Sequence, residues 1–126
     1  MIYGIGTDIV QIARISDSVQ RFGERFARKV LTEEEFSEYL VSRHPERLLA
    51  KRFAAKEAVA KALGLGFREG LAFHLIGITH DKYGKPAVFY RGRALAYIRK
   101  IGITESMISL SDERHYAVAF AVLLGS

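Results

Sequence analysis

The fold is organised around one segment, residues 53–63, which reads FAAKEAVAKAL. Alanine, leucine and lysine are good helix formers, and no glycine or proline occurs in this segment before Gly64. The segment is entered through residues 45–49, PERLL, and proline is favoured at the first position of a helix. We therefore predict a helix of about four or five turns that ends at Gly64.

This predicted helix has two different faces. At 100° per residue, large apolar side chains form one narrow stripe and small ones a second face, where another backbone could approach. The stripe contains Leu49, Phe53, Ala60 and Leu63, and the small face contains Ala50, Ala54 and Ala58. Glu57 lies between the two faces, and Lys61 follows one turn later. Alone, this is an ordinary helical Glu–Lys pair, worth a few tenths of a kcal/mol.

Composition limits what the chain can do. Its 126 residues suit one domain, residues 1–126, with little room for a deep cleft, so a site shared between subunits is plausible. The absence of cysteine excludes disulfides, thiol catalysis and zinc–thiolate sites. We expect a cytoplasmic protein without a membrane segment, because the N-terminus does not resemble a signal peptide and no long apolar run occurs. The net charge of +5 favours an anionic partner.

Residues 1–10 are predicted to form a strand that contains an unexpected acid. Gly4 and Gly6 would allow a backbone or a ligand to come close. Asp8 interrupts an otherwise apolar segment, and a carboxylate is costly to bury alone. It therefore caps the following helix, caps a turn or binds a cation.

Residues 11–31 show a helical pattern that Gly23 could divide into two pieces. If the helix is continuous, four arginines fall in a strip roughly 60° wide, opposite the apolar side. They are Arg14, Arg21, Arg25 and Arg28. The strip is either an ordinary charged surface or a docking surface for an acidic helix or a phosphate backbone.

The remaining pattern predicts an α+β fold, with an antiparallel sheet packed on the long central helix. Thr32 and Glu35 form a capping box for a further helix. Residues 64–70 are a glycine-rich loop without a Walker motif. Strands are expected at 71–80, 87–90, 107–111 and 115–124, with a bulge near Ile76 and a short helix at 92–101. The last strand is apolar on both faces, which indicates a central strand or a subunit contact.

Several motifs in this order resemble the holo-[acyl-carrier-protein] synthases, the small phosphopantetheinyl transferases. They are GIGTDIV at 4–10, RFAAKEA at 52–58 followed by Lys61, GKP at 84–86, and a Ser-Leu-Ser segment before a Tyr-Ala-x-Ala strand. The resemblance implies transfer of 4′-phosphopantetheine from coenzyme A to a serine of apo acyl carrier protein. It also implies Mg²⁺, release of adenosine 3′,5′-bisphosphate, a role in fatty acid biosynthesis, and a homotrimer with active sites between subunits.

The resemblance also implies roles for particular residues. Mg²⁺ is commonly held by one or two carboxylates together with substrate phosphates, a role that Asp8 and Glu57 can fill. Lys61 matches the family lysine that we assign to the pyrophosphate. Further candidates for coenzyme A contacts are Arg52, Lys56, Gly64 and His115. The residues that match the carrier-docking helix are Arg14, Arg21 and Arg25.

Two points of the resemblance stay open. Many family members have a histidine where this chain has Asp112, so Arg114 or His115 could replace that contact to coenzyme A. The general base is either an acid within residues 34–38 or a metal-held water. Two other classes of function also fit part of the pattern: a small basic nucleic-acid-binding domain, which leaves Asp8 and Glu57 unexplained, and a non-catalytic domain that binds carrier protein or coenzyme A.

Overall fold

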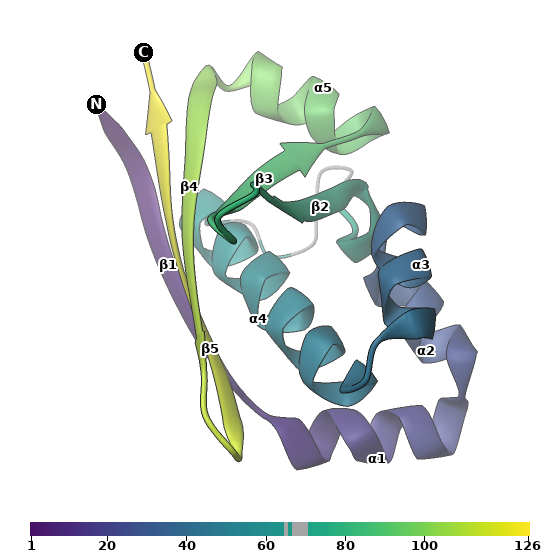
Figure 1. The fold of residues 1–126 in the computed structure, drawn as a ribbon. Coiled ribbons are helices and arrows are strands. Elements are labelled where there is room, and N and C mark those ends of the chain that lie inside the picture. Colours follow the sequence, from purple (N-terminus) through teal and green to yellow (C-terminus); the bar gives the residue numbers. More distant parts are fainter. Residues whose placement is uncertain (65, 67–70) are drawn as a thin grey trace.

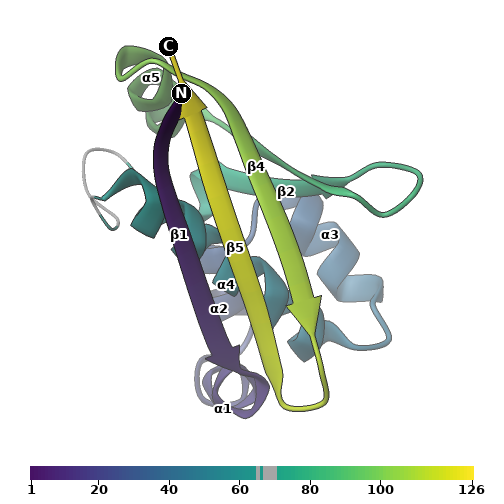
Figure 2. The same cartoon turned by 90° about the vertical axis from the view of Figure 1, so that its left-hand side faces the viewer.

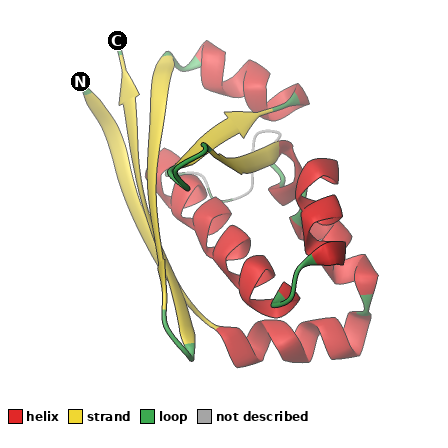
Figure 3. Ribbon diagram, in the orientation of Figure 1, coloured by secondary structure: helices red, strands yellow, loops and turns green. Residues whose placement is uncertain are grey.

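The computed structural model describes residues 1–64, 66 and 71–126 of the chain. The first half is mostly helical. After strand β1 (Ile2–Gln11) come α1 (Ile12–Phe22), α2 (Glu24–Val30), α3 (Glu33–Val41) and the long helix α4 (Pro45–Leu63). The second half contains the 3₁₀ turn Phe73–Leu75, β2 (Ile76–His80), β3 (Pro86–Tyr90), α5 (Gly92–Lys100), β4 (Ile103–Asp112) and β5 (Tyr116–Gly125). The predicted α+β class is confirmed (Figure 1; Figure 3).

The strands form two antiparallel sheets. One has the strand order β1-β5-β4, and the other is the hairpin of β2 and β3. In Figure 2 the three-stranded sheet faces the viewer with α4 behind it. The last strand is central, which is one of the two alternatives that its doubly apolar sequence indicated. Its alternate residues Ala117, Ala119 and Ala121 are buried, while Phe120 on the opposite face is 44 % exposed.

Two glycines bring α4 very close to β1. A Cβ atom on Gly4 would lie 2.0 Å from the carbonyl oxygen of Ala62, and one on Gly6 would lie 2.1 Å from that of Ala58. No other residue type fits at either position, because the helix backbone occupies the side-chain space. The small-residue face predicted for α4 therefore packs on the sheet, with Ala58 on the contact. The glycines serve this contact between two backbones.

The helices of the first half build a second core on the other side of α4 (Figure 1). It contains Ile15 of α1, Val30 of α2, Phe36 of α3 and Leu49 of α4. The capping box at the start of α3 is confirmed, since Glu35 N donates to Thr32 Oγ1 at 3.2 Å and Thr32 N donates to Glu35 Oε1 at 2.8 Å.

Three segments bear on the sequence-based expectations. The helical stretch 11–31 is divided at Gly23, one of the two alternatives that the sequence left open, and the φ of 64° at Gly23 belongs to the left-handed region. The strand expected from residue 71 begins only at Ile76, because residues 73–75 form a 3₁₀ turn. The glycine-rich loop lies outside the described residues except for Gly64, which ends α4 with φ 80°, and Gly66.

Within the described residues, no helix is long and apolar enough to cross a membrane.

Candidate active site

The first group of predicted site residues comes together where β1 meets the second half of α4. Lys61 Nζ donates to Asp8 Oδ1 at 3.0 Å and to the Thr7 carbonyl oxygen at 3.1 Å. The Lys61 side chain is 54 % exposed and that of Asp8 is 16 % exposed, so the pair is open to solvent on the lysine side. Gly64 follows Lys61 at the exposed end of the helix.

Glu57 lies one turn before Lys61 and completes the group. Burial first, and then the negative charge of Asp8, raise the pKa of Glu57, while Lys61 acts in the opposite direction. Two carboxylates that repel each other in a half-buried position gain from a shared cation. Hard oxygen donors of this kind suit Mg²⁺, which takes a few protein carboxylates and completes its shell with water and phosphate. Among the described residues no group of three or more His, Cys, Asp or Glu is arranged to hold a metal, so this chain offers the pair alone.

A second charged cluster lies inside the protein, where sequence reasoning had placed ligand contacts. Lys56 is fully buried, and its Nζ bonds to Glu35 Oε1 at 2.6 Å, to the Phe73 carbonyl oxygen at 3.0 Å and to the Val30 carbonyl oxygen. Glu35 also accepts from Ile78 N at 2.9 Å. The expectation that Lys56 contacts coenzyme A phosphates is corrected by this burial, because all three ammonium hydrogens are used between α2, α3, α4 and the segment before β2.

Arg52 belongs partly to the same cluster and partly to a pocket. Its side chain is 5 % exposed, with Nη2 donating to Glu38 Oε2 at 3.0 Å and Nη1 lying 3.4 Å from Glu35 Oε2. Within the described part of the chain, the buried Nη1 has no hydrogen-bond partner. Arg52 is therefore mainly an internal residue, but one that also lines a cavity.

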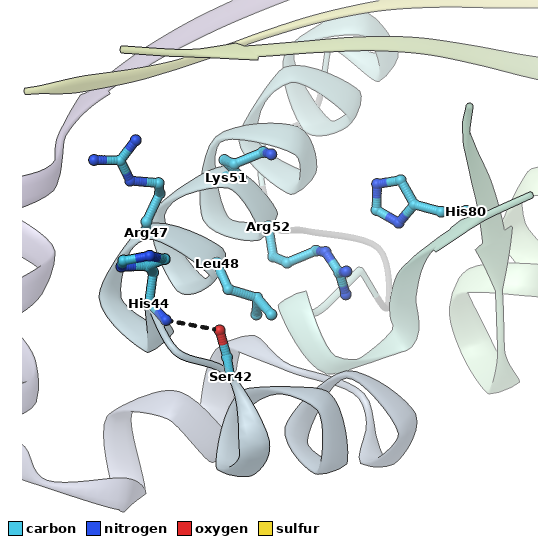
Figure 4. Close-up of a pocket in the computed structure, with 7 residues that line it drawn as sticks. All are labelled: Ser42, His44, Arg47, Leu48, Lys51, Arg52 and His80. Carbon is cyan, nitrogen blue, oxygen red and sulfur yellow. Dashed lines mark hydrogen bonds between the residues drawn. The ribbon is translucent and has the colours of Figure 1, made fainter. Parts of the chain in front are cut away.

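That cavity is a basic pocket of about 200 Å³ at the start of α4. Figure 4 shows its lining, with Leu48 in the middle, Arg47 and His44 on one side, and Arg52 and His80 toward the other. The full set is Ser42, His44, Arg47, Leu48, Lys51, Arg52 and His80. Sequence reasoning missed His44, Arg47, Lys51 and His80. The run of basic residues before the RFAAKEA motif was the available signal for the first three, but only the fold brings His80 to them.

Asp112, the position that departs from the family pattern, contacts this pocket's cations. Its Oδ2 accepts from Arg47 Nη1 at 3.1 Å, and its Oδ1 lies 3.5 Å from Lys51 Nζ. His115, expected at coenzyme A, is an exposed residue of the β4–β5 turn, where its backbone N donates to Glu113 Oε1 at 2.6 Å. Neither His115 nor Arg114 lines the basic pocket.

The predicted docking arginines are divided by the break at Gly23. Arg14 and Arg21 are exposed on α1, whereas Arg25 is exposed on α2. Arg25 lines a hollow with Phe22, Phe26 and Lys29, and Arg28 stacks over the Phe36 ring at 4.1 Å. The single strip expected for a continuous helix is therefore wrong, although the exposed arginines remain on neighbouring elements.

The acids of α3, one of the two alternatives for the general base, are largely paired. Glu34 forms a bidentate contact with Arg91, which lowers the pKa of Glu34. Glu35 is 1 % exposed and held by Lys56, and Glu38 accepts from Arg52. These pairings occupy the carboxylates of Glu34, Glu35 and Glu38, and the lowered pKa of Glu34 makes that residue a weaker base.

Comparison with known proteins agrees with this fold. The family model of the 4′-phosphopantetheinyl transferase superfamily matches residues 4–121. A holo-[acyl-carrier-protein] synthase of Shewanella frigidimarina is 54 % identical and is covered over 97 % of both chains. The crystal structure of the Neisseria meningitidis synthase is 47 % identical, with a TM-score of 0.95 over 98 % of this chain and 99 % of that one. A Bacillus anthracis synthase in complex with CoA (3′,5′-ADP) is 31 % identical, with a TM-score of 0.83 over 100 % of this chain and 99 % of that one.

The α+β fold is thus that of a known enzyme family. The chain belongs to the 4′-phosphopantetheinyl transferase superfamily. Its relatives at about half identity over the whole chain are holo-[acyl-carrier-protein] synthases, and it is an enzyme of that kind, a phosphopantetheinyl transferase. The resemblance inferred from the sequence motifs is confirmed.

Proposed function

We propose that this enzyme, acting as one domain of residues 1–126 in the cytoplasm, transfers 4′-phosphopantetheine from coenzyme A to a serine of apo acyl carrier protein. The reaction depends on Mg²⁺, releases adenosine 3′,5′-bisphosphate and supplies the holo carrier for fatty acid biosynthesis. One observation carries the proposal: Asp8, Glu57 and Lys61 converge on one half-buried position at the β1–α4 contact. Neither a nucleic acid nor a membrane is required by that cluster.

The reaction exchanges one phosphate ester bond for another, and the clustered residues would stabilise the charge that moves in this exchange. The serine oxygen of the carrier forms a bond to the β-phosphorus of coenzyme A as the bond from that phosphorus to the bridging oxygen breaks. The electron pair leaves on the bisphosphate, and the proton of the serine hydroxyl passes to the general base. Asp8 and Glu57 would hold Mg²⁺, which when bound neutralises charge on the phosphate oxygens. Lys61, exposed beside Asp8, can turn from that carboxylate toward the pyrophosphate and add a second positive charge. Gly64 lies beyond it at the end of α4 and leaves space for the ligand.

The basic pocket suits the remaining phosphate of coenzyme A, the 3′-phosphate on the ribose. It gathers three cations, Arg47, Lys51 and Arg52. A phosphate dianion takes charge-assisted hydrogen bonds from such cations. Arg52 therefore stays in the coenzyme A site, whereas Lys56 and His115 have no place in it within this chain.

The metal pair and the pocket are associated with different edge strands of the sheet. Asp8 is on β1, in register with Ala119, and Asp112 beside the pocket is on β4, in register with Ala117. The strands β1 and β4 flank β5, and α4 runs behind the sheet (Figure 2). The family resemblance implies active sites between subunits. We therefore propose that each active site combines the metal pair of one copy with the pocket of another.

An exposed apolar sheet face supports assembly into the homotrimer that the family resemblance implies. On the face turned away from α4, large side chains are roughly half exposed, namely Tyr3, Ile5, Ile9, Met107 and Phe120. Exposed apolar patches of this kind mark interfaces. Sedimentation at assay concentration should give a trimer, and an active monomer would contradict the shared site.

The carrier should dock on the exposed arginines of α1 and α2, because acyl carrier proteins are strongly acidic. Loss of Arg21 removes binding that the ground state and transition state share, so Arg21→Ala should raise KM for the carrier several-fold with little change in kcat. Added salt should have the same effect. A severe fall in kcat with unchanged carrier KM would instead place Arg21 in the active site.

The deciding experiment is the intact mass of apo acyl carrier protein after incubation with this protein, coenzyme A and Mg²⁺. A gain of one phosphopantetheine group, lost in excess chelator, is the expected result. Binding of carrier or coenzyme A without any mass change would favour the alternative of a non-catalytic binding domain.

A further inference from the structure

Among the described residues, Asp112 is the one acid that forms ion pairs with two cations of the basic pocket. It ends β4, and both of its oxygens are used, Oδ2 by Arg47 at 3.1 Å and Oδ1 by Lys51 at 3.5 Å. Arg47 and Lys51 are four residues apart on α4, so one carboxylate bridges two successive helical turns.

These contacts can be exchanged for a ligand without damage to the fold. The side chains of Arg47 and Lys51 are 41 % and 34 % exposed, and that of Asp112 is 22 % exposed. Ion pairs at such exposure contribute only about 0–1 kcal/mol to stability. By contrast, the third cation, Arg52, is 5 % exposed and held from inside by Glu38 and Glu35. The pocket therefore has one fixed cation and two that are shared with Asp112.

We propose that Asp112 is an internal counter-anion that sets the affinity of this pocket for the 3′-phosphate of coenzyme A and of the released adenosine 3′,5′-bisphosphate. It offers Arg47 and Lys51 a carboxylate that a phosphate must displace, and its own negative charge remains next to the bound phosphate. Both effects weaken binding of substrate and product alike. The consequence is faster release of adenosine 3′,5′-bisphosphate, at the cost of a higher KM for coenzyme A. This inference rests on the proposed function, because it assumes a phosphate in the pocket.

The test compares wild type with Asp112→Asn by calorimetry, using adenosine 3′,5′-bisphosphate, coenzyme A and dephospho-coenzyme A as ligands. The amide keeps the shape of the side chain but removes its charge. We expect Asp112→Asn to bind the two 3′-phosphorylated ligands about five- to tenfold more tightly, as for one nearby unit charge. Affinity for dephospho-coenzyme A should not change. The gain should shrink at high salt.

The matched control is Asp17→Asn, which removes one exposed acid from α1 and so makes the same change in net charge. It should leave all three affinities unchanged, and equal gains in both variants would overturn the inference by showing a general charge effect. Unchanged or weaker binding of 3′-phosphorylated ligands to Asp112→Asn would also overturn it, the latter showing that Asp112 orients the cations for the ligand.

Kinetics separates this inference from the proposed function. Product inhibition by adenosine 3′,5′-bisphosphate should become stronger in Asp112→Asn, while KM for coenzyme A falls. If wild type transfers phosphopantetheine but does not distinguish coenzyme A from dephospho-coenzyme A, the inference fails and the proposed transfer stands. If wild type transfers nothing, the proposed function fails irrespective of the calorimetry.

Discussion

Two lysines on α4, Lys56 and Lys61, lie five positions apart and are each paired with a carboxylate, but they differ in burial. Lys56 is fully buried and lies 2.6 Å from Glu35, which is 1 % exposed. Lys61 is mostly exposed and lies 3.0 Å from Asp8. The first pair is closed by further hydrogen bonds to the backbone, whereas the second is open to solvent and close to the half-buried Glu57. The difference shows that one motif, RFAAKEA followed by lysine, supplies both a buried ion pair and a solvent-open one, and we propose the second as part of the reaction site.

The largest effect on the transfer rate should come from removing either carboxylate of the proposed metal pair, Asp8 or Glu57. Asp8→Ala or Glu57→Ala should lower the transfer rate by about 10³-fold or more, because both residues are proposed to hold the ion that stabilises the transferring phosphoryl group. The unfolding temperature should stay close to that of wild type, since neither side chain fills the core. Intact-mass assays and thermal unfolding measure the two quantities. Full turnover of either variant, or of wild type in excess chelator, would contradict the metal assignment.

Disrupting the buried pair of Lys56 and Glu35 should mainly lower the stability of the protein rather than the rate of transfer. Lys56→Met leaves the buried Glu35 with only Arg52, at 3.4 Å, as a nearby cation, and breaking a buried pair in this way typically costs about 3–5 kcal/mol of stability. Denaturant unfolding should show this loss, and the double variant Lys56→Met/Glu35→Gln should recover part of it because the uncompensated charge is gone. If Lys56→Met were stable and raised only KM for coenzyme A, Lys56 would belong to the ligand site after all.

Lys61→Met sharpens the comparison, because it is the same substitution at the exposed lysine. We expect transfer to fall roughly 10- to 100-fold, as for loss of one charge that faces the phosphates. Stability should change by less than about 1 kcal/mol, because the pair with Asp8 is exposed. Steady-state kinetics and denaturant unfolding on the same preparations test this, and unchanged kinetics would remove Lys61 from the site.

The smallest effects are those of pH. Since burial and Asp8 raise the pKa of Glu57, this carboxyl takes up a proton at a higher pH than an ordinary glutamate. Mg²⁺ affinity, followed by calorimetry, should therefore fall as pH falls through this raised pKa, and Glu57→Gln should show a weaker affinity without that dependence. An identical pH profile in both would show that Glu57 is not the titrating ligand.

The buried Lys56 should make the unfolding free energy depend on pH in the alkaline range. Burial lowers the pKa of Lys56 to about 8 from its usual 10.5, so the folded protein loses this proton before the unfolded chain does. The unfolding free energy of wild type, relative to Lys56→Met, should rise as pH increases from about 8 to about 10.5. A constant difference between the two proteins across this range would mean that Lys56 keeps its ordinary pKa.

Local sequence patterns predicted the secondary structure correctly where that structure depends on residues close together in the chain. The helix from Pro45 to Gly64 follows from helix-forming residues and a terminal glycine, and the capping box at Thr32 follows from side chains three residues apart. It failed at residues 71–75, where apolar alternation suggested a strand but the chain makes a 3₁₀ turn before Ile76. That turn places the Phe73 carbonyl oxygen at Lys56 Nζ, a contact between distant parts of the chain that no local pattern encodes.

The sequence by itself determined the family, the central helix and the candidate pair of Asp8 and Glu57, because these depend on periodicity and on motifs at set spacings. Only the tertiary structure decided that the last strand is central in its sheet and which lysines of α4 are open to solvent. Lys56 and Lys61 occur in the same helix with similar neighbours, yet packing of α2, α3 and the segment before β2 buries one and leaves the other exposed. Burial is a property of what packs against a residue, and the cost of removing a charge from water makes that packing decide whether a lysine holds the fold or meets a substrate.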